Sequence, residues 1–345
     1  MPSSNGVRPI IIQGHTRPLT MVKYNREGDL LFTAAKDNQP SVWYADNGER
    51  IGTYNGHNGT VWCLDVNFDS THLLTGAADN MCKLWKVETG ECLHTWKHTA
   101  PVRDVRFAIG EKQFLTVLDN IMGNVPTIFI WDLELHNLAN HPDCPKQTIH
   151  GHTSKITRAL WGPINQTIYS SGDDATIRVW DPETKEQKMV CEGVHTKRIT
   201  DMQFSLDMTQ IVTSCGDHFV RLFEASTLTL LKQFNTERNI NSAAVSPIPK
   251  LPYVIAAGGQ DAMSVTTTAA KQGNFHCSFF DYVFDDELGK IDGHFGPVNT
   301  LAFAPHGRSY TSGGEEGYVR IHHLPQDYFD AFERKVAEAH GRDWP

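Results

Sequence analysis

Several features that mark common protein classes are missing from this sequence. It has no uninterrupted apolar run near the roughly eighteen residues that a membrane-spanning helix needs. Its start lacks the basic flank and apolar stretch of a signal peptide. Its seven cysteines are odd in number and include no Cys-x-x-Cys pair, which favours free thiols in a reducing compartment over a disulfide framework. We therefore expect a cytoplasmic protein.

Positive charge and phosphate-binding loops are also scarce. The formal net charge of −9 argues against a protein whose main task is to hold nucleic-acid backbones. No glycine-rich loop follows a strand and opens a helix, so nothing indicates a nucleotide cofactor. Hydrophobic residues make up 40% of the chain, which is enough for a sizeable core and excludes general disorder.

What the sequence does contain is an internal repeat. A histidine, replaced once by asparagine, precedes each Thr/Val/Ile-rich segment, and an acid follows it after 22 residues in six units and 21 in the third. The separations between successive anchors are 41–44 residues, with two longer ones of 54 and 55. The base period matches the blade length of a WD-repeat propeller. The anchors are His15, His57, His98, His152, His195, Asn239 and His294.

The segments between the anchors predict β-strands, because residues 61–68, 201–207 and 300–305 alternate apolar and polar side chains before turn residues. We predict an all-β fold, a seven-bladed WD40 β-propeller over residues 7–324, with a disordered extension over 1–6. The last unit supplies only three strands, so residues 8–13 are expected to complete blade seven and leave no open edge. Residues 325–345 are expected to form a helical tail.

The recurring polar residues predict a buried hydrogen-bond relay. The anchor histidine is expected to bond the acid, and a hydroxyl four residues before the acid to bridge histidine and the indole N–H of the third strand. Leu115 and Ala257 occupy the hydroxyl position in units three and six. Blade five has His195, Thr213 and Asp217 with Phe223, and blade seven has His294, Ser312 and Glu316 with His322. The complete sets are His15, Thr33, Asp37 and Trp43; His57, Thr75, Asp79 and Trp85; and His152, Ser170, Asp174 and Trp180.

The same residue types could also indicate a catalytic triad or a zinc site. Histidine, serine and aspartate could form a hydrolase triad, but a triad occurs once per site and not in register in several repeats. The stretch 136–152 is rich in histidine and contains Cys144, yet it has no recognised zinc-ligand spacing. We expect no catalytic residue, no metal and no cofactor.

The tail differs in kind from the repeats. Residues 326–340 predict a helix with Tyr328, Phe329, Phe332 and Val336 along one side and charges on the other. Such a stripe either packs beneath its own propeller or docks a partner, and the sequence leaves both open.

Three segments resemble one WD-repeat family. They are RPIIIQGHTRPLTMVKYNREGDLLFTAAKD near the start, GGQDAMSVTTTAAKQGNF in the sixth unit, and DDELGKIDGHFGPVNTLAFAPHGRSYTSGGEEGYVRIHH near the end. They are similar to the subunit I family of eukaryotic translation initiation factor 3, and the resemblance runs from Arg8 to the terminal helix. The sixth-unit motif is not part of the general WD pattern, which makes it specific.

The resemblance implies a non-catalytic scaffold subunit that supports assembly of the small-ribosomal-subunit preinitiation complex, mRNA recruitment and scanning. In that family a C-terminal helix of the b subunit binds across blades five and six, and the g subunit joins the same module. Neither a membrane nor direct RNA contact is expected. Carried onto this chain, the partner-binding residues are Asp207, Leu222, Glu224, Thr227 and Gln260. Two alternatives stay open: Asp207 as a β-turn residue only, and Leu222 as a core residue.

Two other functions stay open for a propeller. A signalling scaffold of the G-protein β type needs an N-terminal coiled coil, and only about a dozen residues precede the first anchor here. A hydrolase or lectin-like propeller needs converging carboxylates or a metal cluster at the central channel, and the sequence indicates neither.

Overall fold

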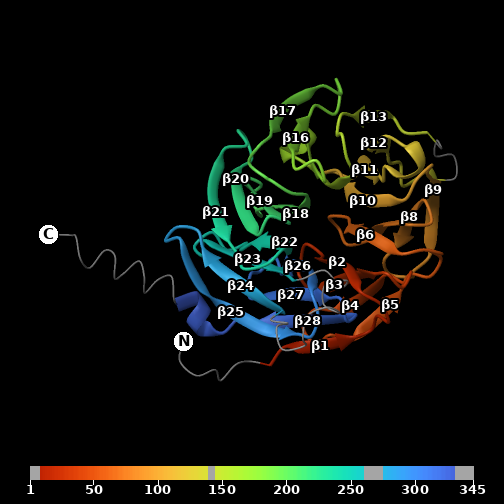
Figure 1. The fold of residues 1–345 in the computed structure, drawn as a ribbon. Coiled ribbons are helices and arrows are strands. Elements are labelled where there is room, and N and C mark those ends of the chain that lie inside the picture. The colour runs from red at the N-terminus through yellow and green to blue at the C-terminus, as the bar shows by residue number, and fades with distance from the viewer. Residues whose placement is uncertain (1–7, 139–143, 260–274, 331–345) are drawn as a thin grey trace.

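The computed structural model describes residues 8–138, 144–259 and 275–330. In these residues, 28 strands form seven four-stranded antiparallel sheets that follow one another around a ring (Figure 1). The predicted seven-bladed all-β propeller is therefore confirmed. None of the helices in the same residues is long and apolar enough to cross a membrane.

Blades one to six are each a meander of four consecutive strands, with the first strand innermost. Blades one to three contain β2 (Leu19–Tyr24), β3 (Leu30–Ala35), β4 (Ser41–Tyr44) and β5 (Arg50–Thr53); β6 (Val61–Val66), β7 (His72–Ala77), β8 (Met81–Lys86) and β9 (Cys92–Lys97); and β10 (Val102–Phe107), β11 (Gln113–Leu118), β12 (Thr127–Asp132) and β13 (Gln147–His150). Blades four to six contain β14 (Ile156–Trp161), β15 (Ile168–Gly172), β16 (Ile177–Trp180) and β17 (Gln187–Cys191); β18 (Ile199–Phe204), β19 (Gln210–Cys215), β20 (Phe219–Glu224) and β21 (Leu230–Asn235); and β22 (Ile240–Val245), β23 (Tyr253–Gly258), β24 (Phe275–Asp281) and β25 (Asp286–His294).

Blade seven combines β26 (Val298–Phe303), β27 (Ser309–Gly314) and β28 (Tyr318–His323) with β1 (Ile10–Gln13) from the start of the chain. Short 3₁₀ helices, η1 (Ile121–Gly123) and η3 (Pro163–Asn165), lie in connections.

The middle strands are buried on both faces because a neighbouring blade packs on each side. In β3, β7 and β11 all residues after the first are buried, although the sequences mix apolar side chains with threonine, alanine and glycine. The outer strand β17 contains no fully buried residue. Burial therefore falls from the inside of each blade to its rim, as expected for sheets that cover one another.

The ring closes through the first strand of the chain. Strand β1 pairs antiparallel with β28, and Ile12 lies opposite Val319. Ile12 is 3% exposed and packs with Leu19, Val319 and Ile321. The prediction that the N-terminal strand completes blade seven is confirmed.

Polar contacts also join the innermost strands from blade to blade. Lys23 pairs with Asp65, Arg158 Nε donates to Asp201 at 2.8 Å, and Ser242 Oγ donates to the same aspartate at 2.5 Å. The circuit continues through backbone N–H groups: Phe107 to Asp65, Ala159 to Asp104, Leu301 to Ser242, and Val22 to Thr300.

The carboxylates of this circuit are almost fully buried. Burial raises the pKa of Asp104. Burial acts the same way on Asp201, but Arg158 and Ser242 outweigh it and lower the pKa of that carboxyl. Asp201 therefore holds blades four, five and six together as a paired anion.

The described start of the tail packs on its own propeller. Residues 326–330 are helical, and the rings of Tyr253 and Tyr328 lie 5.0 Å apart. Tyr328 and Phe329 both pack against the core shared by blades six and seven. Phe332 and Val336, and the extension over 1–6, lie outside the described residues.

Ring closure by β1 gives a test with a matched control. Ile12→Asp should lower the free energy of unfolding by about 3 kcal/mol or more, because it places an unpaired carboxylate in the core of blade seven. Ile11→Asp, one residue away but 47% exposed, should change stability by less than about 0.5 kcal/mol. Urea unfolding followed by tryptophan fluorescence compares the two, and equal effects would contradict closure by this strand.

Candidate functional site

Blades one, two and four each contain a four-residue chain of hydrogen bonds. In blade one, Trp43 Nε1 donates to Thr33 Oγ1 at 2.8 Å, that hydroxyl lies 2.7 Å from His15 Nε2, and His15 Nδ1 lies 2.8 Å from Asp37 Oδ2. Blades two and four repeat these contacts at 2.7–2.8 Å. The predicted members therefore lie together in all three blades.

One order of protons satisfies every group in this relay. The indole donates to the hydroxyl, the hydroxyl donates to Nε2, and Nδ1–H donates to the carboxylate. The carboxylate also accepts a hydrogen bond from the backbone N–H of the residue after the histidine. In blade one, Thr16 N donates to Asp37 Oδ2 at 3.2 Å. Because the hydroxyl is held between an indole and an imidazole, it is not presented to a substrate. The relay ties the loop before each blade to its own turn.

The acids of the relay stay ionised. Burial would raise the pKa of Asp174, but the hydrogen bonds from His152 and Thr176 outweigh it and lower the pKa to about 2. The pKa values of Asp37 and Asp79 are lowered for the same reason.

Blade seven keeps the part of the relay that joins the acid, the histidine and the hydroxyl. Glu316 Oε1 lies 2.6 Å from His294 Nδ1, and His294 Nε2 lies 2.7 Å from Ser312 Oγ. His322 replaces the tryptophan and stacks on Tyr310, with ring centroids 4.6 Å apart.

Blade three uses a hydroxyl that the spacing rule missed. Trp131 Nε1 donates to Thr116 Oγ1 at 3.0 Å, while Asp119 pairs with Arg103. Counting back from the acid gives Leu115, because the turn here is one residue shorter. Counting forward 18 residues from His98 gives Thr116, and the same step leads from His15 to Thr33. The distance from the histidine was the better signal. In blade six, Asp261 lies outside the described residues.

Blade five departs from the expected direct bond between His195 and Asp217. Arg221 Nη1 lies between them, 3.0 Å from His195 Nδ1 and 2.9 Å from Asp217 Oδ2. Since Arg221 donates to Nδ1, the imidazole proton must sit on Nε2, which lies 3.3 Å from Thr213 Oγ1. Phe223 supplies no indole N–H, so Thr213 is free to accept this bond. The order of protons is thus reversed in this blade.

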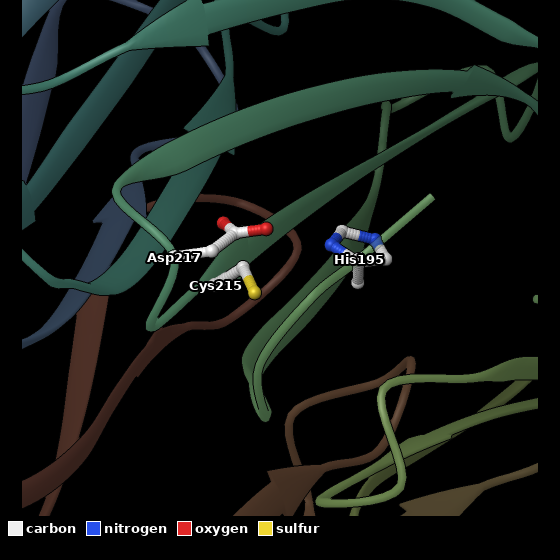
Figure 2. A group of neighbouring side chains, drawn as sticks. All are labelled: His195, Cys215 and Asp217. Atoms are coloured by element: carbon white, nitrogen blue, oxygen red, sulfur yellow. The ribbon is translucent and has the colours of Figure 1, made fainter. Parts of the chain in front are cut away.

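His195, Asp217 and Cys215 converge closely enough to suggest a metal site (Figure 2). Two facts argue against one. Arg221 already supplies the positive charge between the imidazole and the carboxylate. Cys215 Sγ already donates to the backbone carbonyl of Lys197 at 3.2 Å, and burial raises the pKa of this thiol to about 11.

The residues expected to bind a partner lie partly at one end of blade five. Asp207 is in the β18–β19 turn, where it accepts hydrogen bonds from Ser205 Oγ at 2.5 Å and Thr209 Oγ1 at 2.8 Å. These bonds lower its pKa. Glu224 ends β20 opposite Gln210 and accepts a bond from Thr227 Oγ1 at 2.7 Å. Asp207, Glu224 and Thr227 are exposed, and both turns lie at the same end of the blade.

Two members of that set need separate treatment. Leu222 is 1% exposed and packs in the core with Val212, Phe234 and Val254. A partner on this surface cannot contact its side chain, so its inclusion in the contact set is corrected: it supports the surface from beneath. Gln260 lies outside the described residues.

Sequence reasoning missed the apolar part of this surface. A cleft of about 520 Å³ runs between blades five and six, lined by Leu230, Leu231 and Phe234 of β21 and by Phe280 and Glu287 of blade six. Lys232 and Asp285 form an ion pair of 2.5 Å between its two sides. Further exposed apolar side chains lie in the neighbouring turns: Leu206, Val283 and Phe284. The acids of blade five thus stand beside a cleft whose lining mixes these apolar side chains with polar and charged ones.

Comparison with known proteins connects this architecture to a family. A profile of the EIF3I family matches residues 7–333. The chain belongs to the EIF3I family. It is 46% identical over 324 residues to eukaryotic translation initiation factor 3 subunit I of Bombyx mori, covering 94% of this chain and 98% of that protein. The proteins of the same name from Drosophila grimshawi and Drosophila melanogaster are 46% and 45% identical over 325 residues, covering 94% of this chain and 99% of theirs. The EIF3I match includes blades five and six.

The relay gives a graded stability test. Thr75→Val should cost about 2–6 kcal/mol of unfolding free energy, because it leaves both Trp85 N–H and His57 Nε2 buried without a partner. Thr116→Val leaves only the indole N–H of Trp131 without a partner and should lower the unfolding free energy by about 1–3 kcal/mol. Calorimetry measures the unfolding free energy of both variants. If Thr116→Val lowered it as much as Thr75→Val, the result would argue against the relay.

Buried neutral histidines predict a pH dependence. Burial lowers the pKa of His322 to about 3 and that of His195 to about 4, below the value of about 6.5 in an unfolded chain. The unfolded state therefore binds protons that the folded state does not, and stability should fall as the pH drops from 6.5 toward 4. The carboxylate of Asp174 adds its own loss only below about pH 4.

His322→Phe keeps an aromatic ring stacked on Tyr310 and removes one of the two histidines that the unfolded chain protonates. The slope of unfolding free energy against pH should shrink by up to about 1.4 kcal/mol per pH unit between pH 4.5 and 6. Urea titrations at several pH values measure this slope, and an unchanged slope would show that His322 is not buried in the neutral form.

Proposed function

We propose that this protein is a non-catalytic scaffold subunit of eukaryotic translation initiation factor 3 that acts in the cytoplasm. In this proposal, blades five and six bind a C-terminal helix of the b subunit, the g subunit joins the same module, and the complex works on the small ribosomal subunit. The observation that carries it is the surface where Asp207 and Glu224 stand beside a cleft that combines exposed leucines with polar and charged side chains. Membership of the EIF3I family supports the assignment.

The surface suits an amphipathic helix with basic residues. Leu230, Leu231 and Phe234 offer an apolar lining to the apolar side of such a helix. Asp207 and Glu224 offer two carboxylates that an arginine of the helix can reach with charge-assisted hydrogen bonds. Complementary charge also raises the rate of association and selects the partner.

Catalysis is not supported by the arrangement of polar groups. The histidine, hydroxyl and acid sets recur around the ring as satisfied relays, whereas a catalytic triad stands alone beside a substrate pocket. The buried carboxylates of the inner strands are engaged by basic side chains, as Asp65 is by Lys23 and Asp201 by Arg158. This also weakens the hydrolase and lectin-like alternatives.

Charge reversal on blade five tests the proposed contact. Asp207→Lys with Glu224→Lys should weaken binding of the b-subunit helix at least tenfold, because two attractive contacts become repulsive. Binding of a labelled helix peptide is measured by fluorescence anisotropy. Loss of the turn hydrogen bonds that Asp207 and Glu224 accept should cost about 1–3 kcal/mol of unfolding free energy, and circular dichroism verifies that the variant is folded.

The control reverses two exposed acids on turns of other blades. Asp46→Lys with Glu88→Lys makes the same change in net charge on the turns that follow β4 and β8. This variant should keep at least half of the original affinity. Equal weakening in both variants would mean that only total charge matters, and no weakening in either would remove blade five from the interface.

A further inference from the structure

The chain leaves blade seven differently from every other blade. In blades one to six the third strand turns back into a fourth strand, but in blade seven β1 already occupies that fourth place. Leu324 N donates to the carbonyl of Arg308 at 2.9 Å, and Pro325, which has no N–H to donate to a sheet, follows it. The segment after β28 is therefore released from the sheet of blade seven and can pack on another blade.

The released segment packs on blade six. Its helical residues 326–330 lie beside that blade in Figure 1. The ring of Tyr328 lies 5.0 Å from that of Tyr253 and 6.1 Å from that of Phe279, in both cases edge to face. Phe329 packs against the same core. Tyr253 and Phe279 are buried, so Tyr328 is part of the cover over two aromatic rings of blade six.

Strand β24 lies between the tail and the cleft of blades five and six. Phe279 belongs to the core that blade six shares with blade seven, whereas its neighbour Phe280 belongs to the core shared with blade five. Phe280 lines the cleft and stacks on Phe234, with ring centroids 5.0 Å apart. Because successive side chains of a strand point to opposite faces, a shift of β24 at Phe279 also shifts a ring in the lining of the cleft.

The end of β24 also holds the turn at the edge of the cleft. Asp281 lies opposite Tyr253 in the pairing of β23 with β24, and both residues are fully buried. The carboxylate of Asp281 accepts hydrogen bonds from the backbone N–H groups of Val283 at 3.0 Å and Phe284 at 3.1 Å. The position of the turn 282–285 therefore depends on the same strands that Tyr328 covers.

We propose that the C-terminal helix of this chain holds the blade-six side of the cleft in the shape that a partner helix binds, with Tyr328 as the positioning residue. This inference rests on the proposed function, because the occupant of the cleft is the same partner helix. Tyr328 is not one of the residues that line the cleft, so it acts through β24 and the turn that follows. In that turn Asp285 pairs with Lys232 of blade five, which links the place of the turn to the width of the cleft.

The physical effect of the tail is pre-organisation. A side of the cleft that is held in place before the partner arrives loses little conformational freedom on binding. Without the ring of Tyr328, Tyr253 and Phe279 lose a packed neighbour, and the turn 282–285 opens more often. The partner must then order this turn when it binds, and the loss appears as a lower affinity.

Tyr328→Ala in the full chain tests the proposal through two measurements. Hydrogen exchange of the amides in the turn 282–285, followed by mass spectrometry, should accelerate at least fivefold, because the hydrogen bonds to Asp281 open more often. The affinity for the same labelled helix peptide as in the charge-reversal test should fall at least fivefold. Tyr328→Phe keeps the ring contacts and should leave both quantities within twofold of the original.

Two matched variants separate this effect from a general loss of stability and from direct contact with the partner. Tyr54→Ala removes a buried tyrosine that packs against Trp85, in the connection between blades one and two. Gln326→Ala changes an exposed residue of the tail helix itself. Both variants should leave the exchange of 282–285 and the affinity within twofold.

The proposal is overturned if Tyr328→Ala leaves the exchange of the turn unchanged, or accelerates it without a loss of affinity. It is also overturned if Tyr54→Ala or Gln326→Ala weakens binding as much as Tyr328→Ala does. If the unaltered chain does not bind the peptide, the proposed function fails, and the exchange measurement alone then decides whether the tail holds the turn.

Discussion

The structure depends on the fact that a four-stranded blade cannot bury both of its faces alone. Strands such as β3 and β7 are buried throughout only because a blade packs on each side. A ring meets this need for every blade at once, provided that it closes. Closure is achieved at the rim by the pairing of Ile12 with Val319, and around the channel by buried ionic and hydrogen-bond contacts such as that of Arg158 with Asp201.

The polar residues of the repeat form hydrogen bonds within the fold. In the intact relays, His15 and its counterparts have both ring nitrogens engaged, and the acid is shared with a backbone N–H. What remains for a partner includes the surface of blades five and six, where Asp207 and Glu224 stand beside a cleft of mixed apolar and polar lining.

The period of histidines and acids was enough to predict the blades, the closure by the first strand and most relay members, because the geometry of a turn demands fixed spacing. It could not place Thr116, since one missing residue in a turn moves the hydroxyl relative to the acid. Nor could it foresee Arg221 between His195 and Asp217, a contact made by a long side chain from the next strand. Leu222 was carried over from the family resemblance, which does not report burial, and in this chain it lies among the four buried residues of β20.

The pairing of β1 with β28 in blade seven has a consequence for the order in which the propeller can fold. The strand that closes the ring is synthesised before all the other strands of the propeller, and its partner β28 is synthesised after them. Until then the apolar residues of β1 have no sheet to join, and the inner blades must form as an open arc with a bare edge. Pairing of the first strand with the last therefore completes the propeller.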